Sequence, residues 1–332
     1  MRTCLMPSRT PLMPPRTPIA LFVYNRPGHT HRVLEALARC EGLGRCQLVI
    51  YSDGPKSLKH EAAVEETRRV VRGWALRFGA DVIEQPCNLG LARSIVGSVT
   101  QLCAAHGRVI VLEDDLVPAP DFLQFMLAGL DRYADDDRVA QISGHLLTET
   151  AEVPTDGLFL QVMQTWGWAT WERAWRMFRW HHAIDPSELD VDPAFRARFT
   201  MDGAYKTMRL LQLRLDGEQD TWGVLWWYAM AKFDKLALHP SRSLIWNGGF
   251  DKSGVHCSGR EVFRPTPPAA FLSPRLSSQI HLPETVSIDH NQMAATREFL
   301  RGPSRSARSS ARLARLALKL RRHLPFASAS AT

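Results

Sequence analysis

Residues Arg108–Leu123 read RVIVLEDDLVPAPDFL, and they join an apolar run to three consecutive acids. The run Val109–Leu112 consists of β-branched and aliphatic residues, as is typical of a strand buried on both faces of a parallel sheet. Glu113, Asp114 and Asp115 follow directly, and adjacent carboxylates repel one another. Local stability therefore does not explain the triplet, which indicates a role for its charge.

Similar strands precede this one, and helical segments separate them. Apolar stretches predict strands at 18–25, 46–54 and 81–86, and residues at helical spacing predict helices over 31–38, 59–78 and 88–107. The alternation predicts an α/β domain with a mainly parallel central sheet flanked by helices. Such sheets bind ligands at the carboxyl ends of their strands. Arg26, Asp53 and the acidic triplet all stand at such ends, so we expect them to share one edge of the sheet.

After the triplet the pattern becomes less regular. We expect a helix at 120–133, strands at 138–145 and 158–163, and a mostly apolar, buried helix at 221–233. Between them, residues 165–180 hold five of the ten tryptophans. The spacing of Trp171 and Trp175 by four residues predicts that both pack in the core.

Composition and charge exclude several classes of protein. The chain has 332 residues, 45% of them hydrophobic and 23% charged, which is ordinary for a globular protein. No apolar run reaches the roughly 18 residues of a membrane span. Residues 301–332 contain seven Arg, one Lys and no acid, so the whole chain's charge of +7 belongs to this tail, and the other 300 residues are nearly neutral. A neutral body argues against a nucleic-acid partner.

The six cysteines show no CxxC and no paired Cys/His spacing, so we expect reduced thiols in a cytosolic protein.

Two interpretations of the triplet stay open from the residues alone. A strand end fixes the position of its acids, and Mg²⁺ or Mn²⁺ binds one or two carboxylates together with substrate phosphates. Because side-chain directions alternate along a strand, another carboxylate can accept hydrogen bonds from a sugar or ribose hydroxyl. A solvated acidic turn is the alternative.

The segment RVIVLEDDLVPAPDFLQFM resembles the DxD-type strand end of GT-A fold glycosyltransferases. It is most similar to the N-acetylglucosaminyltransferase I-like family and its bacterial relatives, which are glycosyltransferase family 2-like. The resemblance covers residues 18–257 and implies a GT-A (nucleotide-diphospho-sugar transferase) fold. It further implies that Asp115 ligates Mn²⁺ or Mg²⁺, which bridges the diphosphate of a nucleotide-sugar. Glu113 and Asp114 would contact the sugar and ribose of this donor.

Three further residues resemble donor contacts of that family. Arg26 in YNRP would contact the nucleotide, Asp53 in YSDG would read the uracil, and Arg93 in NLGLARSI would lie near the diphosphate. Each has a plainer alternative. Arg26 would then be a surface turn residue, Asp53 a turn-forming Asp-Gly, and Arg93 a solvated helix residue.

The family also uses a carboxylate just before an aromatic-rich helix as the base that deprotonates the acceptor. Asp220 in DGEQDTWGVLWW fits this position, with an N-cap as the alternative role and Glu218 as the neighbouring competitor.

Two glycine-containing segments complete the expected site. TWGWATW places a glycine between Trp166 and Trp168, which suits a wall that stacks on an acceptor sugar, with core packing as the alternative. WNGGFDKSGVHC (246–257) resembles a loop that closes over the donor. Gly249 suits such a mobile lid, and His256 would contact phosphate or metal unless it is structural.

These features predict four parts in the chain. We expect a disordered leader at 1–17, a glycosyltransferase domain at 18–265, a linker at 266–302 and a basic amphipathic helix at 303–325. Within the domain, 18–116 would bind the nucleotide-sugar and 117–265 would hold the acceptor and the base. The helix has leucines on one face and Arg and Lys on another, which is typical of helices that lie on anionic membranes. A disordered tail or a helix docked on the body is the alternative. Membrane contact would make the protein cytoplasmic and peripheral on the inner face of the membrane.

The expected function is that of a metal-dependent, inverting glycosyltransferase. It would move a sugar from a nucleotide-sugar such as UDP-GlcNAc to a hydroxyl of a glycan or lipid-linked acceptor. A nucleotidyltransferase of similar fold is one alternative, although it usually needs a Gly-rich, basic loop and YNRPGHTHR has a single glycine. A non-catalytic, membrane-associated protein that binds sugars or nucleotides is the other.

Overall fold

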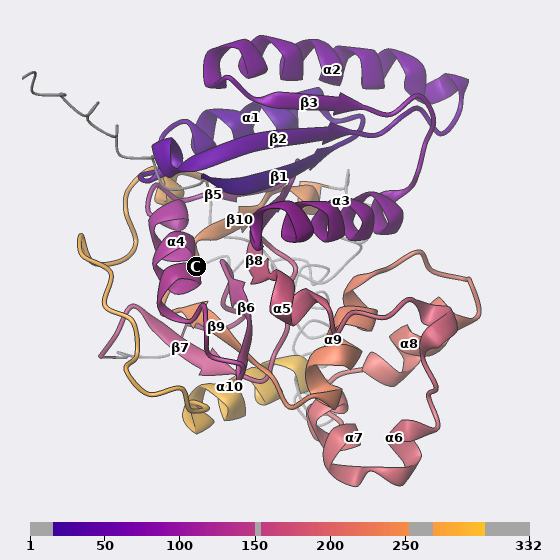
Figure 1. Cartoon of the computed structure of the whole chain (residues 1–332), viewed down its shortest axis with the longest axis vertical. Helices are drawn as coiled ribbons and strands as arrows, with labels where there is room; N and C mark the ends of the chain where they lie inside the picture. Colours follow the sequence, from indigo (N-terminus) through magenta and orange to yellow (C-terminus); the bar gives the residue numbers. More distant parts are fainter. Residues whose placement is uncertain (1–15, 150–153, 252–267, 303–332) are drawn as a thin grey trace, which may run out of the picture.

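The computed structural model describes residues 16–149, 154–251 and 268–302, and it has a mixed α/β architecture (Figure 1). Its centre is an eight-stranded sheet with the strand order β3-β2-β1-β4-β8-β6-β9-β7, flanked by helices. A two-stranded sheet, β10-β5, lies beside it. The expected α/β fold with a central sheet flanked by helices is therefore confirmed.

The first half of the chain builds the parallel part of the sheet. Strands β1, β2, β3 and β4 pair in parallel and are connected through helices α1, α2 and α3. These elements are β1 (Thr17–Val23), α1 (Pro27–Leu37), the 3-10 turn η1 (Leu43–Arg45), β2 (Cys46–Ser52), α2 (Leu58–Phe78), β3 (Asp81–Glu84), α3 (Leu91–His106) and β4 (Arg108–Glu113). The expected strands and helices of this half all form, with ends that differ by a few residues.

The second half of the chain adds four strands to the sheet, most of them paired antiparallel. Strand β8 pairs antiparallel with both β4 and β6, β6 pairs in parallel with β9, and β7 pairs antiparallel with β9. These elements are β5 (Leu116–Pro118), α4 (Phe122–Arg132), β6 (Val139–Ser143), β7 (Gly157–Leu160), β8 (Trp168–Trp171), α5 (Glu172–Trp175), η2 (His181–Ala183), α6 (Glu188–Val191), α7 (Pro193–Thr200), α8 (Thr207–Leu215), α9 (Gly223–Lys232), β9 (Leu236–Pro240), β10 (Ile245–Asn247), η3 (Gly248–Asp251), η5 (Pro268–Phe271) and α10 (His290–Arg301).

Both faces of the sheet are covered, which explains the continuous apolar strands. All seven residues of β1 are buried. Its alternate residues enter two different cores, because successive side chains in a strand point to opposite faces. Leu21 packs in the core that contains α1 and α4, and Phe22 packs in the core that contains α3 and α9. The sheet is thus rigidly held between two layers, and so are the ends of its strands.

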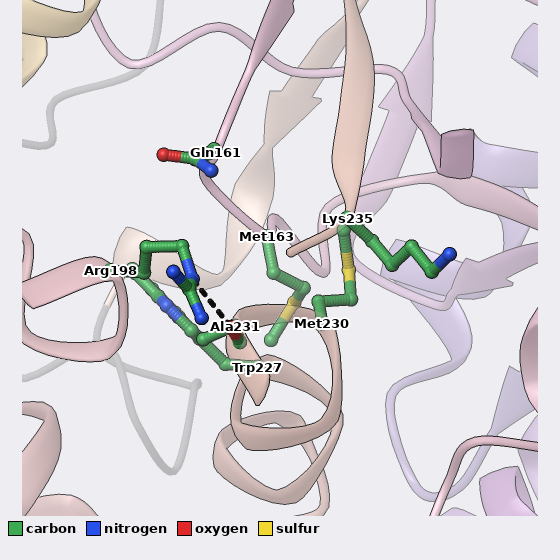
Figure 2. A pocket seen from close by; sticks show the side chains of 7 residues that line it. All are labelled: Gln161, Met163, Arg198, Trp227, Met230, Ala231 and Lys235. Carbon is green, nitrogen blue, oxygen red and sulfur yellow. Dashed lines mark hydrogen bonds between the residues drawn. The ribbon is translucent and has the colours of Figure 1, made fainter. Parts of the chain in front are cut away.

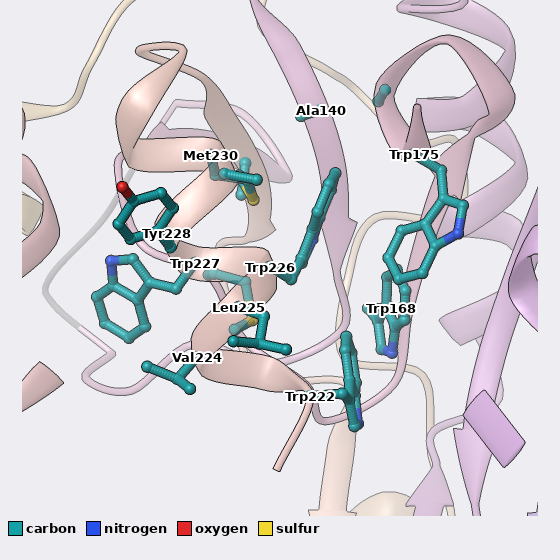
Figure 3. Packing of buried hydrophobic residues seen from close by; sticks show 14 of the residues in the cluster. Ala140, Trp168, Trp175, Trp222, Val224, Leu225, Trp226, Trp227, Tyr228 and Met230 are labelled. Atoms are coloured by element: carbon teal, nitrogen blue, oxygen red, sulfur yellow. The ribbon is translucent and has the colours of Figure 1, made fainter. Parts of the chain in front are cut away.

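The aromatic segment contributes to the second of these cores (Figure 3). Trp168 is fully buried, and its ring stacks on Trp222 with centroids 5.0 Å apart. Trp175 lies 5.0 Å from Trp226, on the buried helix α9. The prediction that Trp171 and Trp175 belong to the core is confirmed, since both are buried.

Residues 268–302, which lie within the stretch expected to be a linker, pack on the domain. The buried carboxylate of Asp121 accepts hydrogen bonds from the backbone N–H groups of Arg275 and Leu276, at 2.8 and 2.6 Å. Asp156 binds the same stretch farther along, and Met293 of α10 is buried in the core. Buried aspartates that would otherwise lack partners hold this segment along the side of the molecule (Figure 1).

The ends of the chain bear on two further expectations. The leader at 1–17 lies almost entirely outside the described residues, and the amphipathic helix at 303–325 lies wholly outside them. Among the helices that the structure describes, none combines the length and the apolar character needed to cross a bilayer.

Candidate active site at the carboxyl ends of the strands

The polar strand ends predicted from the sequence meet at one edge of the sheet. Strand β1 has β2 on one side and β4 on the other, so the strand order reverses between β1 and β4. In open α/β sheets, a crevice for ligands forms at such a reversal, outside the carboxyl ends of the strands. Phe22 of β1 pairs with Glu113 of β4, which places the residues that follow each strand next to one another.

Arg26 and the acidic triplet form the centre of this edge. The Arg26 guanidinium donates from Nη1 to Oδ2 of Asp115 at 2.9 Å and from Nη2 to Oδ1 of Asp114. The side chains of Arg26, Asp115 and Asp114 are 20%, 12% and 4% exposed, so the ion pairs have little contact with water. The backbone N–H of Tyr24 also donates to Asp114, at 3.4 Å. One cation is therefore shared between two of the three acids.

The pKa values at this edge reflect burial first and the neighbouring charges second. Burial, followed by the charges of Asp115 and Asp114, raises the pKa of Glu113 to about 8. Burial also raises the pKa of Asp114 to about 6, although the Arg26 guanidinium opposes this. Burial acts to lower the pKa of Arg26, but Asp114 and Asp115 outweigh it, and the pKa lies above its ordinary value. A further cation here would favour the ionised carboxylates.

The segment that follows β10 lies directly against Asp115. Strand β10 pairs with β5, and Gly248 donates its N–H to the carbonyl of Asp115 at 2.7 Å. A β-carbon on Gly249 would lie 2.5 Å from Oδ2 of Asp115, so only glycine allows this approach. Asn247 is buried and its Oδ1 accepts the N–H of Gly249 at 2.8 Å. The expected lid residue Gly249 is thus brought to the acidic triplet, whereas His256 lies outside the described residues.

The residues at this edge fit a hard divalent cation of the kind expected. Carboxylate oxygens are the ligands that Mg²⁺ and Mn²⁺ prefer, and such ions are commonly held by one or two carboxylates plus substrate phosphates and water. Across residues 16–149, 154–251 and 268–302, no group of three or more His, Cys, Asp and Glu is arranged to hold a metal by itself. A cation at Asp115 would therefore need water or the donor's own oxygens to complete its ligands.

Asp53, at the end of β2, organises the turn that leads into α3. Its carboxylate accepts the N–H groups of Leu89 and Gly90 at 2.8 and 3.0 Å, and the Nδ2 of Asn88 at 2.9 Å. It also accepts the N–H of Gly54. Both oxygens are therefore engaged by the chain itself, and a role in reading a base stays a prediction. Asn88 was not singled out in the sequence, although it opens the motif NLGLARSI.

Arg93 lies on the first turn of α3, immediately after this turn. Its side chain is exposed, and it has no side-chain hydrogen bond or ion pair with any other residue that the structure describes. The amino end of a helix and a free guanidinium both favour an anion. The expected position near a diphosphate is compatible with this placement.

Asp220 is not the N-cap of α9, so that alternative is excluded. Helix α9 has no side-chain cap, and Oδ1 of Asp220 instead accepts a hydrogen bond from Nη1 of Arg214 at 2.7 Å. The other oxygen, Oδ2, lies 3.1 Å from where a β-carbon on Gly90 would stand. Asp220 therefore reaches the turn that Asp53 holds, and its side chain remains 55% exposed. Its competitor Glu218 is exposed and makes no comparable contact among the described residues.

Arg214 is a residue that the sequence did not reveal. It is buried beneath the surface of the site, and its Nη2 lies 3.5 Å from Nδ1 of His181. The sequence places it six positions before Asp220, within the polar face of a helix, where nothing distinguishes it from a solvated arginine. Its burial gives Asp220 a fixed, charged partner.

The two tryptophans expected at the acceptor side have different surroundings. Trp166 is half-buried, with ring centroids 4.4 Å from His145 and 5.7 Å from Phe250, which follows Gly249. It therefore lies beside the segment that contacts Asp115. The expectation that Trp168 lines the acceptor side is wrong. Trp168 is the first residue of the central strand β8 and is fully buried, so its ring cannot stack on an acceptor.

Two small cavities lie away from this edge. The one in Figure 2 has a volume of ≈ 10 Å³ and is lined by Gln161, Met163, Arg198, Trp227, Met230, Ala231 and Lys235. A neighbouring one of ≈ 70 Å³ shares Gln161 and Arg198 with it. The first has room for about one water molecule. Neither is lined by a residue expected at the site.

No protein-family model matches the sequence, and no curated protein matches it. Several solved structures match in part. Residues 1–349 of TarS from S. aureus are 11% identical, with a TM-score of 0.41, over 72% of this chain and 62% of that one. The mannosyltransferase PcManGT from Pyrobaculum calidifontis, in complex with GDP-Man and Mn²⁺, is 15% identical, with a TM-score of 0.34, over 48% of this chain and 45% of that one.

Glucosyl-3-phosphoglycerate synthase from Mycobacterium tuberculosis, in complex with Mn²⁺, UDP and glucosyl-3-phosphoglycerate, is a third partial match. It is 14% identical, with a TM-score of 0.31, over 47% of this chain and 57% of that one. The chain thus covers less than two thirds of each of these structures. A likeness of this extent assigns no activity to the chain.

Proposed function

We propose that the chain is a metal-dependent, inverting glycosyltransferase that uses a nucleotide-sugar. The observation that supports this most is the convergence of Arg26, Asp114 and Asp115 where the strand order reverses, next to the segment that contains Gly249. A buried acidic edge with too little positive charge suits a ligand that brings both a cation and hydroxyl groups. A UDP-sugar such as UDP-GlcNAc, bound with Mn²⁺ or Mg²⁺, has this chemistry.

Each donor-side residue has a role in this proposal. Asp115 holds the divalent cation, while Glu113 and Asp114 accept hydrogen bonds from the hydroxyl groups of the sugar and the ribose. Arg93, on the exposed first turn of α3, attracts the diphosphate. Asp53 positions the turn before that helix and thereby the nucleotide beside it. The cation, when bound, acts as a Lewis acid that stabilises the departing diphosphate.

Asp220 is the general base of the proposed reaction. The acceptor hydroxyl attacks the anomeric carbon, the bond from that carbon to the diphosphate oxygen breaks, and the hydroxyl proton passes to Asp220. The hydrogen bond from Arg214 fixes one oxygen of Asp220, which leaves the oxygen near Gly90 for the proton. An attack from the face opposite the leaving group inverts the anomeric configuration.

The acceptor would be a glycan or a lipid-linked sugar, with Trp166 beside it. We also propose that residues 303–325 hold the protein on an anionic membrane surface at the inner face, close to such acceptors. The support for this is the distribution of Leu and of Arg and Lys in that segment of the sequence.

A transfer assay tests this function. A panel of nucleotide-sugars with Mn²⁺ is offered to the full chain, and release of the nucleoside diphosphate is measured with and without acceptor glycans. Asp220→Asn should keep donor binding, measured as a thermal shift, and reduce transfer by about 10²-fold or more. Asp216→Asn is the matched control, since Asp216 is an exposed aspartate of the same segment.

The outcomes separate the alternatives. Transfer that survives in Asp220→Asn would refute the base assignment. Donor binding without turnover in the wild type would favour a non-catalytic binding protein, and pyrophosphate release from nucleoside triphosphates would favour a nucleotidyltransferase. No response to any donor, with or without Mn²⁺, would refute the transferase.

A further inference from the structure

We propose that Arg26 is the resident counter-cation of the acidic strand end, and that a divalent metal ion has to displace it from Asp115 before the donor can bind. The inference rests on the proposed function, because it concerns the same cation site. It goes beyond that function in making the metal ion and an arginine of the chain compete for one carboxylate.

The competition follows from the contacts of a single oxygen atom. Oδ2 of Asp115 accepts the hydrogen bond from Nη1 of Arg26 at 2.9 Å. The same oxygen faces the backbone of Gly249, where a β-carbon would come within 2.5 Å. Arginine on one side and tightly packed backbone on the other leave this oxygen little room for a third partner. A metal ion needs to approach a carboxylate oxygen to about 2.0–2.6 Å.

The charges at Asp115 also indicate that Arg26 and a metal ion cannot bind it together. A guanidinium and a divalent cation on one carboxylate would repel each other strongly, because the group is largely shielded from water. Arg26 also binds Asp114, which is 4% exposed, so before any ligand arrives it offsets one of the two negative charges of the pair. Removal of the guanidinium would leave both acids without a cation and would increase their attraction for a metal ion.

The backbone of Arg26 is anchored while its side chain has a route to water. The Arg26 carbonyl accepts hydrogen bonds from both the N–H and the Oγ1 of Thr30, each at 3.0 Å, at the start of α1. The side chain is 20% exposed. A rotation about its side-chain bonds therefore moves the guanidinium off Asp115 without unfolding α1. The freed group remains at the strand reversal, where the diphosphate of the donor offers it a new anionic partner.

Metal binding without any nucleotide tests this inference. The full chain is titrated with Mn²⁺, and free Mn²⁺ is measured by electron paramagnetic resonance. Arg26→Gln should bind Mn²⁺ at least about tenfold more tightly than the wild type, since the ion no longer has to break the charge-assisted hydrogen bond between Arg26 and Asp115. Arg26→Lys, which keeps the charge but not the paired donors, should fall between the two.

Two control variants define the site. Arg72→Gln removes one positive charge from the exposed pairs with Glu65 and Glu84, and it should leave the Mn²⁺ affinity within about twofold of the wild type. Asp115→Asn should lose the Mn²⁺ site. Thermal melting of each variant verifies that it is folded, and Arg26→Lys carries the test if Arg26→Gln does not fold.

Mn²⁺ binding by the folded Arg26 variants that is equal to or weaker than that of the wild type would overturn the inference. A complete lack of Mn²⁺ binding by the wild type and by both Arg26 variants would also overturn it. Because the titration contains no donor, its result is independent of the transfer assay. A protein that transfers sugar but shows no effect of Arg26 would refute this inference alone. A tighter Mn²⁺ site in a protein that accepts no nucleotide-sugar would refute the proposed function alone.

Discussion

Gly249→Ala should disturb both the stability of the protein and its acidic strand end. The new β-carbon would lie 2.5 Å from Oδ2 of Asp115 and 3.1 Å from Oδ1 of Asn247, whereas ordinary contacts begin at 3.4 Å. Relief of the first contact alone requires a shift of about 0.9 Å, and Asn247 is buried with little freedom to move. Overpacking of this kind typically costs about 1–3 kcal/mol. Urea denaturation at pH 7 should show a loss of that size in the free energy of unfolding.

A second glycine provides the matched control. A β-carbon on Gly97, in the interior of α3, meets no atom within 4 Å. Gly97→Ala should therefore stabilise the protein by about 0.5–1 kcal/mol, because alanine favours the helix. The Mn²⁺ affinity should fall in Gly249→Ala and stay unchanged in Gly97→Ala. If Gly249→Ala is as stable as the wild type and binds Mn²⁺ equally well, the close packing of Gly249 on Asp115 is refuted.

Three further predictions concern other parts of the site and the core. Asp53→Asn should lower the free energy of unfolding by about 1–3 kcal/mol, since one amide oxygen cannot replace two carboxylate oxygens for the N–H groups before α3, and denaturation measures this. Arg214→Gln should lower kcat more than KM and shift the pH profile of transfer, with partial rescue by Arg214→Lys, whereas a purely structural arginine would leave the profile in place. Burial lowers the pKa of His145 to about 3, whereas in the unfolded chain this pKa has its ordinary value of about 6.5. As the pH falls, His145 is therefore protonated in the unfolded chain before it is protonated in the folded one. The contribution of His145 to stability is thus fully present above pH 6.5 and should fall by roughly 1–2 kcal/mol by pH 5. His145→Gln should reduce this loss in urea titrations without abolishing it, since burial also lowers the pKa of His239.

The parallel half of the fold was predictable because its signals are local. Each strand there is a short run of apolar residues, and two of the three helices end at a glycine, Gly79 after α2 and Gly107 after α3. The position of the acidic triplet follows from the same pattern. A strand end fixes where the acids lie in the sheet, and this property can be read from the sequence alone.

The antiparallel half was less predictable because its signals are ambiguous. Strand β8 reads WATW, and tryptophans beside a glycine suit a sugar-binding surface as well as a core. Only the pairing of β8 between β4 and β6 decides that Trp168 is buried. The attachment of the segment at 268–302 depends in part on Asp121 and Asp156, which lie more than 100 residues earlier in the sequence.

The partners of the site residues were the least predictable feature. Arg26 and Asp114 are 88 positions apart, and no sequence pattern indicates that one guanidinium serves two acids of the triplet. The pairing of Arg214 with Asp220 is closer in sequence, yet it depends on the burial of Arg214 by the surrounding helices. Residue type and position along a strand could be predicted, but ion-pair partners are set by the tertiary structure.

The central claim is that Asp115 couples a divalent cation to a nucleotide-sugar at this edge. Calorimetric titration of UDP and of UDP-sugars into the full chain, with and without Mn²⁺, tests it most directly. The wild type and Asp220→Asn should bind at least one of these ligands only when Mn²⁺ is present, and Asp115→Asn should bind none. Equal binding by the wild type and Asp115→Asn, or no binding by the wild type with Mn²⁺, would contradict the claim.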